Sequence, residues 1–144
     1  MIELIIIIVL IGIFTTMALT RTETGLTTIK EQIAIDQITN DIDLARSMAF
    51  ARNEKIIIMF DKDHESYGVY DESGIITTFP NSDNNGIISL DNSSLRNVDI
   101  KNVNFSGSSN LQFQPLGDPI SGGTIELNTK TITIEPITGK WNVN

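Results

Sequence analysis

The first 20 residues contain an uninterrupted apolar stretch that constrains the fold more than any other feature of the chain. No charged residue occurs from Leu4 to Thr20, and Arg21 is the first basic one. A helix of these seventeen residues, rising about 1.5 Å per residue, spans roughly 25 Å, just enough for the hydrocarbon core of a bilayer with local thinning. The stretch therefore predicts a membrane helix.

Two other interpretations of the apolar stretch are weaker. A cleaved signal peptide carries basic residues before its apolar run, whereas the early charge here is the acidic Glu3. A buried core helix would need cover on every side for Ile5 to Val9, which are consecutive β-branched residues. The rest of the chain leaves a head of about 90 residues, which is too small to supply that cover.

Glu3 is the unusual residue of this helix, because an isolated acid at bilayer depth costs on the order of a few kcal/mol and usually has a partner. In one interpretation Glu3 sits where the headgroups begin and the helix macrodipole favours an acid. In the other it pairs with a positive group on a neighbouring chain, so that assembly neutralises a buried carboxylate. The residues themselves leave both interpretations open.

A second helical pattern follows the apolar stretch, and no proline interrupts it between Leu26 and Arg52. Its apolar residues recur at spacings of three and four, which predicts a helix with one apolar face. They are Ile35, Ile38, Ile42, Ala45 and Ala49, and Leu26, Ile29 and Ile33 extend the pattern backwards. We expect one helix from about Ile2 to Arg52, with a soft spot near Gly25 because threonine and glycine are poor helix formers. Its second half should cover a sheet.

After Asn53 the pattern changes to short β-strands separated by polar turns. Strands are expected at 55–60, 67–70, 75–79, 87–90, 98–105, 111–113, 124–127, 131–134 and 141–143. One long helix followed by many antiparallel strands predicts an α+β fold in which the helix packs on the sheet. We therefore expect three parts: 1–24 as the transmembrane and assembly half of the helix, 25–53 as its amphipathic half, and 54–144 as a β-rich head.

Little in the chain points to chemistry. It has no cysteine, its net charge is −8, and its single histidine, His64, falls in a predicted turn. An acidic head argues against nucleic-acid binding, and a solvated turn histidine argues against catalysis. We expect no enzyme activity and no cofactor. A weak calcium candidate is formed by Asn81, Asp83 and Asn85, although the twelfth position of this loop is Asn92 rather than a bidentate glutamate.

The run Ile2-Glu3-Leu4, followed by an aliphatic stretch with Gly12, resembles the N-terminus of type IV pilins and type II secretion pseudopilins. The resemblance implies that Glu3 neutralises the N-terminal amine of an adjacent subunit. It also implies that the apolar helices form a filament core. We therefore expect Gly12, together with Ile35, Ile38 and Ile42, to serve helix packing.

The chain also departs from the family pattern. Members carry a short leader ending in glycine and then Phe-Thr, and both are missing before Met1. Met1 falls where the third mature residue would be, so we expect the reading frame to begin upstream. The proline often found near the end of the apolar run is also missing, so no proline kink is expected there.

The remainder of the chain is similar to one branch of this superfamily, the minor pseudopilin H (GspH/FimT) type. Three segments carry the similarity: 44–53 resembles the end of that branch's helix, 113–117 its Phe-x-Pro-x-Gly turn, and 132–140 its closing strand and Thr-Gly-Lys turn. The branch implies a structural minor subunit of a type II secretion pseudopilus or a type IV pilus. Such a subunit helps to prime or cap the filament and supports protein secretion.

The resemblance also implies partners and a location. The expected partners are other pilin-like subunits, the prepilin peptidase that precedes N-terminal methylation, and secreted cargo. The expected location is the bacterial inner membrane, crossed once, with a periplasmic or extracellular head. Two alternatives remain open: a major type IV pilin that forms a surface fibre, and a competence minor pilin that binds DNA.

Overall fold

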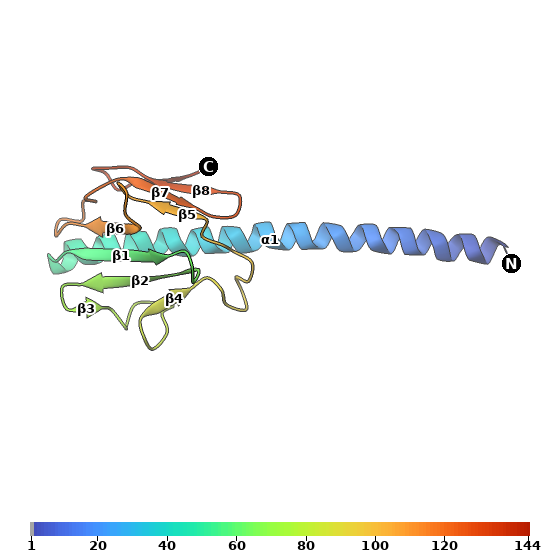
Figure 1. Ribbon diagram of the computed structural model, residues 1–144, viewed down its shortest axis with the longest axis horizontal. Coiled ribbons are helices and arrows are strands. Elements are labelled where there is room, and N and C mark those ends of the chain that lie inside the picture. The colour runs from blue at the N-terminus through green and yellow to red at the C-terminus, as the bar shows by residue number, and fades with distance from the viewer. Residues whose placement is uncertain (1) are drawn as a thin grey trace.

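A single long helix carries a small β head at one end (Figure 1). The computed structural model describes residues 2–144 and, within them, every side chain except those of residues 18–24. Helix α1 spans Ile2–Arg52 and continues through Gly25, as the sequence predicts. Figure 1 shows its N-terminal part projecting far beyond the head, while its C-terminal part lies against the strands.

Helix α1 ends where its backbone reverses at Asn53. This residue adopts a left-handed conformation with φ of 53°, and the amide of Glu54 donates to the carbonyl of Ala49 at 3.3 Å. Asparagine tolerates that conformation better than most residues, and the bond from the second residue past the helix satisfies one of its last carbonyls. The chain therefore turns directly from α1 into the first strand.

The strands form two antiparallel sheets. The first has the order β3-β2-β1-β6, and β4 also pairs with β2; its strands are β1 (Ile56–Asp61), β2 (Ser66–Asp71), β3 (Gly74–Ile75), β4 (Ile87–Ser89) and β6 (Asn110–Phe113). The second has the order β5-β7-β8-β9; its strands are β5 (Asn102–Asn104), β7 (Gly123–Glu126), β8 (Thr131–Ile134) and β9 (Trp141–Val143). The α+β class predicted from the sequence is thus confirmed.

The hydrophobic core lies between α1 and the two sheets. On the helix it is formed by Ala34, Ile35, Ile38, Ile42, Ala45 and Ala49, all at most 1% exposed. Alternate residues of β1, β6 and β8 face this stripe, as the two-residue period of a strand requires. The amphipathic half of the helix and the head therefore share one core.

The backward extension of the apolar stripe was predicted wrongly. Leu26 and Ile29 are each 58% exposed and Ile33 is 48% exposed. The physical reason is angular, because Ile29 and Ile38 are nine residues apart, which is two and a half turns of about 3.6 residues and places them on opposite sides of the helix. These three side chains therefore lie outside the core, and Ile33 lines a surface hollow together with Gln37 and head residues such as Leu95.

Two predicted strands are much shorter in the structure. Strand β3 ends at Ile75, because residues 76–82 form turns in which Phe79 donates to Ile76 and Ser82 to Phe79. Strand β5 starts only at Asn102. Before it, side chains take the backbone donors that a neighbouring strand would use: Asp99 donates to the Asn128 side chain and Ile100 to the Glu65 carboxylate.

A buried hydrogen bond joins α1 to β2. The Tyr67 hydroxyl donates to Oδ2 of Asp41 at 2.7 Å, and these two residues are 1% and 4% exposed. Burial disfavours the ionised carboxylate and raises the pKa of Asp41 to about 6, although the Tyr67 hydrogen bond acts in the opposite direction. The folded head therefore binds a proton at Asp41 more tightly than the unfolded chain does.

The raised pKa of Asp41 predicts that the head loses stability as pH rises from about 4 to about 6. Below this window both states are protonated, and above it the folded state carries a buried charge that costs up to about 3 kcal/mol. Asp41→Asn should remove this decline. Urea unfolding of the wild-type chain and of Asp41→Asn at pH 4 and pH 7 measures this decline. The other titrating groups are the same in the two proteins, so the difference between them reports Asp41. An equal decline in Asp41→Asn would refute the assignment.

Candidate functional site

The N-terminal half of α1 presents an apolar surface on all sides. Every residue from Ile2 to Met17 is exposed. The large apolar side chains among them are 48–74% exposed; they are Ile2, Leu4, Ile5, Ile6, Ile7, Ile8, Val9, Leu10, Ile11, Ile13, Phe14 and Met17. The hydroxyls of Thr15 and Thr16 donate to helix carbonyls three or four residues earlier, so they add little polarity to this surface.

Two predicted site residues lie on this surface. Glu3 is in the first turn of α1 and is exposed. A Cβ atom added at Gly12 would meet no atom within 4 Å, so the chain by itself leaves the space beside this glycine open. Ile35, Ile38 and Ile42, predicted to serve packing, lie in the core of the head.

The transmembrane half was expected at residues 1–24. Among the residues that the structure describes, no helix has the length and apolarity that crossing a membrane requires. Met1 and the side chains of residues 18–24, which that prediction included, lie outside the described part.

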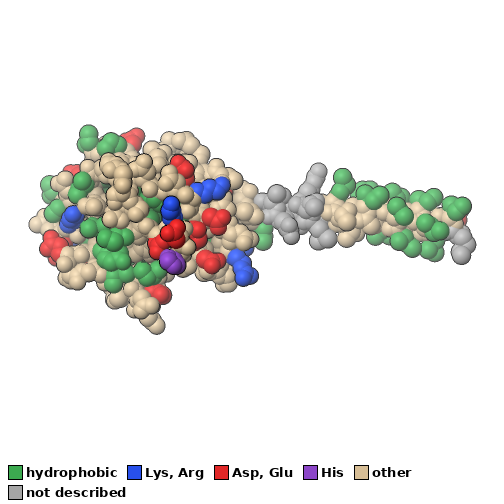
Figure 2. All heavy atoms as spheres, in the orientation of Figure 1, with side chains coloured by type: hydrophobic (Ala, Val, Ile, Leu, Met, Phe, Trp, Pro, Cys, Tyr) green, Lys and Arg blue, Asp and Glu red, His purple; other side chains and the backbone are tan. Residues whose placement is uncertain are grey.

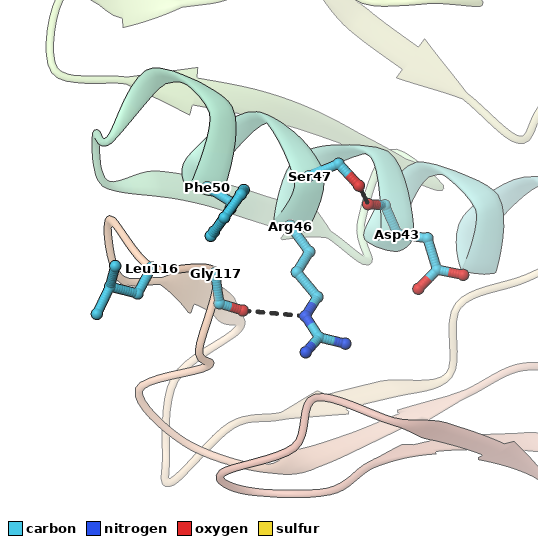
Figure 3. A pocket seen from close by; sticks show the side chains of 6 residues that line it. All are labelled: Asp43, Arg46, Ser47, Phe50, Leu116 and Gly117. Carbon is cyan, nitrogen blue, oxygen red and sulfur yellow. Dashed lines mark hydrogen bonds between the residues drawn. The ribbon is translucent and has the colours of Figure 1, made fainter.

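At the other end of α1, three segments far apart in sequence meet around Arg46. The Nε atom of Arg46 donates to the carbonyl of Gly117 at 3.1 Å, as Figure 3 shows. A Cβ at Gly117 would lie 3.2 Å from the Arg46 carbonyl, and one at Gly139 would lie 3.6 Å from the Arg46 guanidinium carbon. Both glycines have positive φ, 82° and 63°, which side chains rarely adopt. Arg46 therefore joins the two turns to the helix end.

These contacts surround a hollow of about 530 Å³ at the tip of the head. Asp43, Arg46, Ser47 and Phe50 line it from α1, and Leu116 and Gly117 line it from the turn after β6 (Figure 3). Phe50 is 67% and Leu116 70% exposed. The hollow thus combines the guanidinium of Arg46 and the carboxylate of Asp43 with an apolar rim.

The calcium candidate is used structurally in the described residues. Oδ1 of Asp83 accepts the backbone amides of Asn85 and Ile87, both at 2.8 Å. Asn81 lies at φ 62°, in the turn that leads into this loop. No group of three or more His, Cys, Asp or Glu side chains suited to a metal occurs in the part of the chain described. Calcium binding here stays a prediction.

His64 is paired with an acid on the surface. Its Nδ1 lies 2.7 Å from Oδ2 of Asp61, and both side chains are largely exposed. The hydrogen bond and charge of Asp61 raise the pKa of His64, and the same hydrogen bond lowers the pKa of Asp61. Within the described residues no serine or threonine hydroxyl is bonded to this ring.

Sequence reasoning missed one buried acid at the base of the head. Glu31 is 2% exposed. Its Oε1 accepts the amides of Thr129 and Lys130 at 2.7 and 3.0 Å, and its Oε2 accepts the Thr129 hydroxyl at 2.6 Å. Thr129 and Lys130 were recognised only as a hairpin turn, and the partner 98 residues earlier leaves no local signal. Glu31 fixes the β7–β8 hairpin to α1.

The comparisons with known proteins found a matching family. A family model described as "Type II transport protein GspH" matches residues 34–143. The match begins where α1 enters the core and covers the whole head except the last residue. It includes the Arg46 contacts and both turns that they join. No curated protein and no solved structure matched.

Proposed function

This chain belongs to the GspH family of type II transport proteins, and we propose that it is a minor pilin-like subunit that enters a secretion filament through the N-terminal half of α1. The role is structural rather than catalytic. Family membership supports the secretion machinery as its setting. The exposed apolar surface of residues 2–17 supports the way in which it assembles.

That apolar surface carries the proposal. Apolar area left in water costs roughly 25 cal/mol per Å², and soluble monomers rarely expose a continuous patch of this size. In Figure 2 the described side chains of the projecting helix are almost all hydrophobic. We infer that the same halves of neighbouring subunits cover this surface in the filament.

Glu3 and Gly12 have separate parts in this assembly. Once neighbouring helices cover the surface, Glu3 becomes a buried carboxylate that needs a positive partner. We propose the N-terminal amine of an adjacent subunit as that partner. Gly12 has no side chain and leaves open space beside the helix, and small residues of this kind let apolar helices approach closely.

The proposal includes a route and a position. Before assembly, the apolar half rests in the bacterial inner membrane, with the head on the periplasmic side, where a prepilin peptidase prepares the subunit. As a minor subunit, it primes or caps the filament and supports the passage of secreted cargo. The Arg46 contacts keep the head rigid at the end remote from the helix interface.

Photo-crosslinking tests the proposed interface in the source bacterium. A benzophenone amino acid is placed at Ile13, in the middle of the apolar half, or at Ser73, an exposed head residue, and the full chain is irradiated in cells. We expect Ile13 to form adducts with the N-terminal helices of other pilin-like subunits. Ser73 should form few such adducts. Equal adducts from both positions, or none from Ile13, would contradict the proposal.

A further inference from the structure

The head has a second apolar surface at the end opposite the projecting helix. Its residues, here called the tip patch, are Phe50, Leu116, Ile137 and Trp141, which are 67%, 70%, 80% and 40% exposed. Phe50 and Leu116 line the Arg46 hollow, and Ile137 lies in the same turn as Gly139. In Figure 2 hydrophobic side chains at this end of the head lie among polar and charged ones. The patch is remote from the proposed filament helix.

Ile137 is held in a strained conformation within this patch. Its φ is 78°, a left-handed value that is a genuine outlier for a β-branched residue and is energetically unfavourable. Hydrogen bonds around Ile137 fix the turn. The Gly139 amide donates to the carbonyl of Glu135, and the Thr138 hydroxyl donates to the Glu135 carboxylate. The turn thus keeps a large apolar side chain in solvent, which points to a role in contact.

Arg46 supplies the polar part of the same surface. Its Nε is committed to Gly117, but its two terminal nitrogens make no hydrogen bond or ion pair within the part of the chain that the structure describes. No ion pair joins Asp43 to Arg46 in the described residues, and Oδ2 of Asp43 accepts a hydrogen bond from the Trp141 indole at 3.1 Å. Figure 3 shows Asp43 on the side of Arg46 away from Leu116. The hollow therefore offers an unpaired guanidinium beside an apolar rim.

We propose that the hollow and the tip patch form a docking site for a partner protein segment that carries one carboxylate among apolar residues. The carboxylate forms a forked hydrogen-bonded pair with the terminal nitrogens of Arg46. The flanking apolar side chains rest on Phe50 and Leu116. Because the chain has a net charge of −8, a generally acidic segment is repelled, whereas a single acid in apolar surroundings matches the single guanidinium.

An unbiased selection tests the chemistry of the occupant. A phage-displayed dodecapeptide library is selected on the full chain in detergent micelles, and binders to a Phe50→Ser/Leu116→Ser variant are removed. Both residues are exposed, so the variant should fold. We expect the surviving peptides to carry Asp or Glu next to apolar residues. Survivors without an acid, or no survivors, overturn the proposal.

The only tryptophan of the chain, Trp141, then reports binding by its fluorescence. A synthetic peptide from the selection is compared with its amide analogue, in which Asn or Gln replaces the acid. We expect saturable binding that is at least about tenfold weaker for the analogue and unchanged in Met59→Ser, an exposed apolar position outside the hollow. The proposal is overturned if the analogue binds as tightly as the parent peptide, or if Met59→Ser weakens binding as much as the analogue does. Arg46 stays intact because it also holds Gly117.

Discussion

Replacing Gly123 with alanine should separate the two strands that hold the second sheet to the core. A Cβ at Gly123 would collide with the carbonyl oxygen and the ring of the two residues beside it, Asn104 and Phe105, and would lie 2.9 Å from the Phe105 Cα. Because two of these atoms are backbone, a side-chain rotation does not relieve the clash. We expect a loss of at least about 3 kcal/mol, the upper part of the range for overpacking.

The collision has consequences beyond β7. Phe105 is 2% exposed, and its ring stacks on Phe60 of the first sheet with centroids 6.3 Å apart. Displacing it should loosen both sheets. Thermal unfolding followed by near-ultraviolet circular dichroism should show a midpoint lowered by roughly 12–24 °C, at about 4–8 °C per kcal/mol for a domain of this size.

Gly12→Ala is the matched control for this substitution. The added methyl meets nothing within 4 Å, and alanine favours a helix over glycine by about 1 kcal/mol. The head of Gly12→Ala should therefore unfold at or slightly above the wild-type temperature. If Gly123→Ala unfolds at the wild-type temperature as well, the packing of β7 against β5 is not as described.

Glu31→Ala should have the second large effect, a loss of about 3 kcal/mol. The substitution leaves the amides of Thr129 and Lys130 without the carboxylate that accepts them. Hydrogen bonds to a charged group contribute roughly 1.5–3 kcal/mol each, and because Thr129 is exposed, water can reach the freed amides and keeps the loss near the lower end of their sum. Urea unfolding of the full chain in detergent measures the loss. Glu31→Gln, which keeps an acceptor oxygen, should recover part of it.

A neighbouring substitution and the pH dependence of stability both test whether the Glu31 carboxylate itself causes the loss. Gln32 accepts a hydrogen bond from the Lys130 ammonium at 2.7 Å on the exposed side of the same helix turn. Gln32→Ala should therefore change stability by less than about 0.5 kcal/mol. Burial raises the pKa of Glu31, but the hydrogen bonds of Thr129 and Lys130 and the charge of Lys130 bring it below the ordinary value. The Glu31 contribution should therefore be full above pH 4.5 and fade as pH falls through the lowered pKa.

The sequence predicted the elements whose signals are local. The long helix, most strands and the 128–130 turn follow from residue periods and turn residues that act over a few positions. Strands β3 and β5 were both predicted too long. Strand β3 ends in the local turns of residues 76–82, whereas the groups that keep β5 short are distant in sequence. The Glu65 carboxylate and the Asn128 side chain take the amides of Ile100 and Asp99, and no window around residue 100 contains those partners.

Local signals also failed to predict which residues of helix α1 are buried and which contact distant turns. Leu26 and Ile29 were assigned to the core because apolar residues at helical spacing were read as one face, while the structure divides them between two faces. Arg46 belongs to the 44–53 segment, and its bond to a turn 71 residues later has no local signal in the sequence. The motifs at 44–53, 113–117 and 132–140 were found separately, and their meeting around Arg46 required the fold.

The arrangement of the candidate assembly site was easier to predict from the sequence than the contacts of the head. Glu3, Gly12 and the apolar run are adjacent in sequence and adjacent on one helix. Their arrangement was therefore predictable, and the unknown is the neighbour that completes it. A buried ion pair loses about 3–5 kcal/mol when one partner is removed, which is a change of well over tenfold in an association constant. Glu3 is thus the single residue on which the assembly proposal depends most.

The most direct measurement adds Glu3→Ala to the chain that carries the photo-crosslinker at Ile13. Adducts with pilin-like subunits are compared with those of the parent and of Glu72→Ala, an exposed acid in the head, at equal levels of chain in the membrane fraction. We expect Glu3→Ala to reduce these adducts at least about tenfold and Glu72→Ala to leave them unchanged. Undiminished adducts in Glu3→Ala would refute the proposed role of Glu3 in assembly.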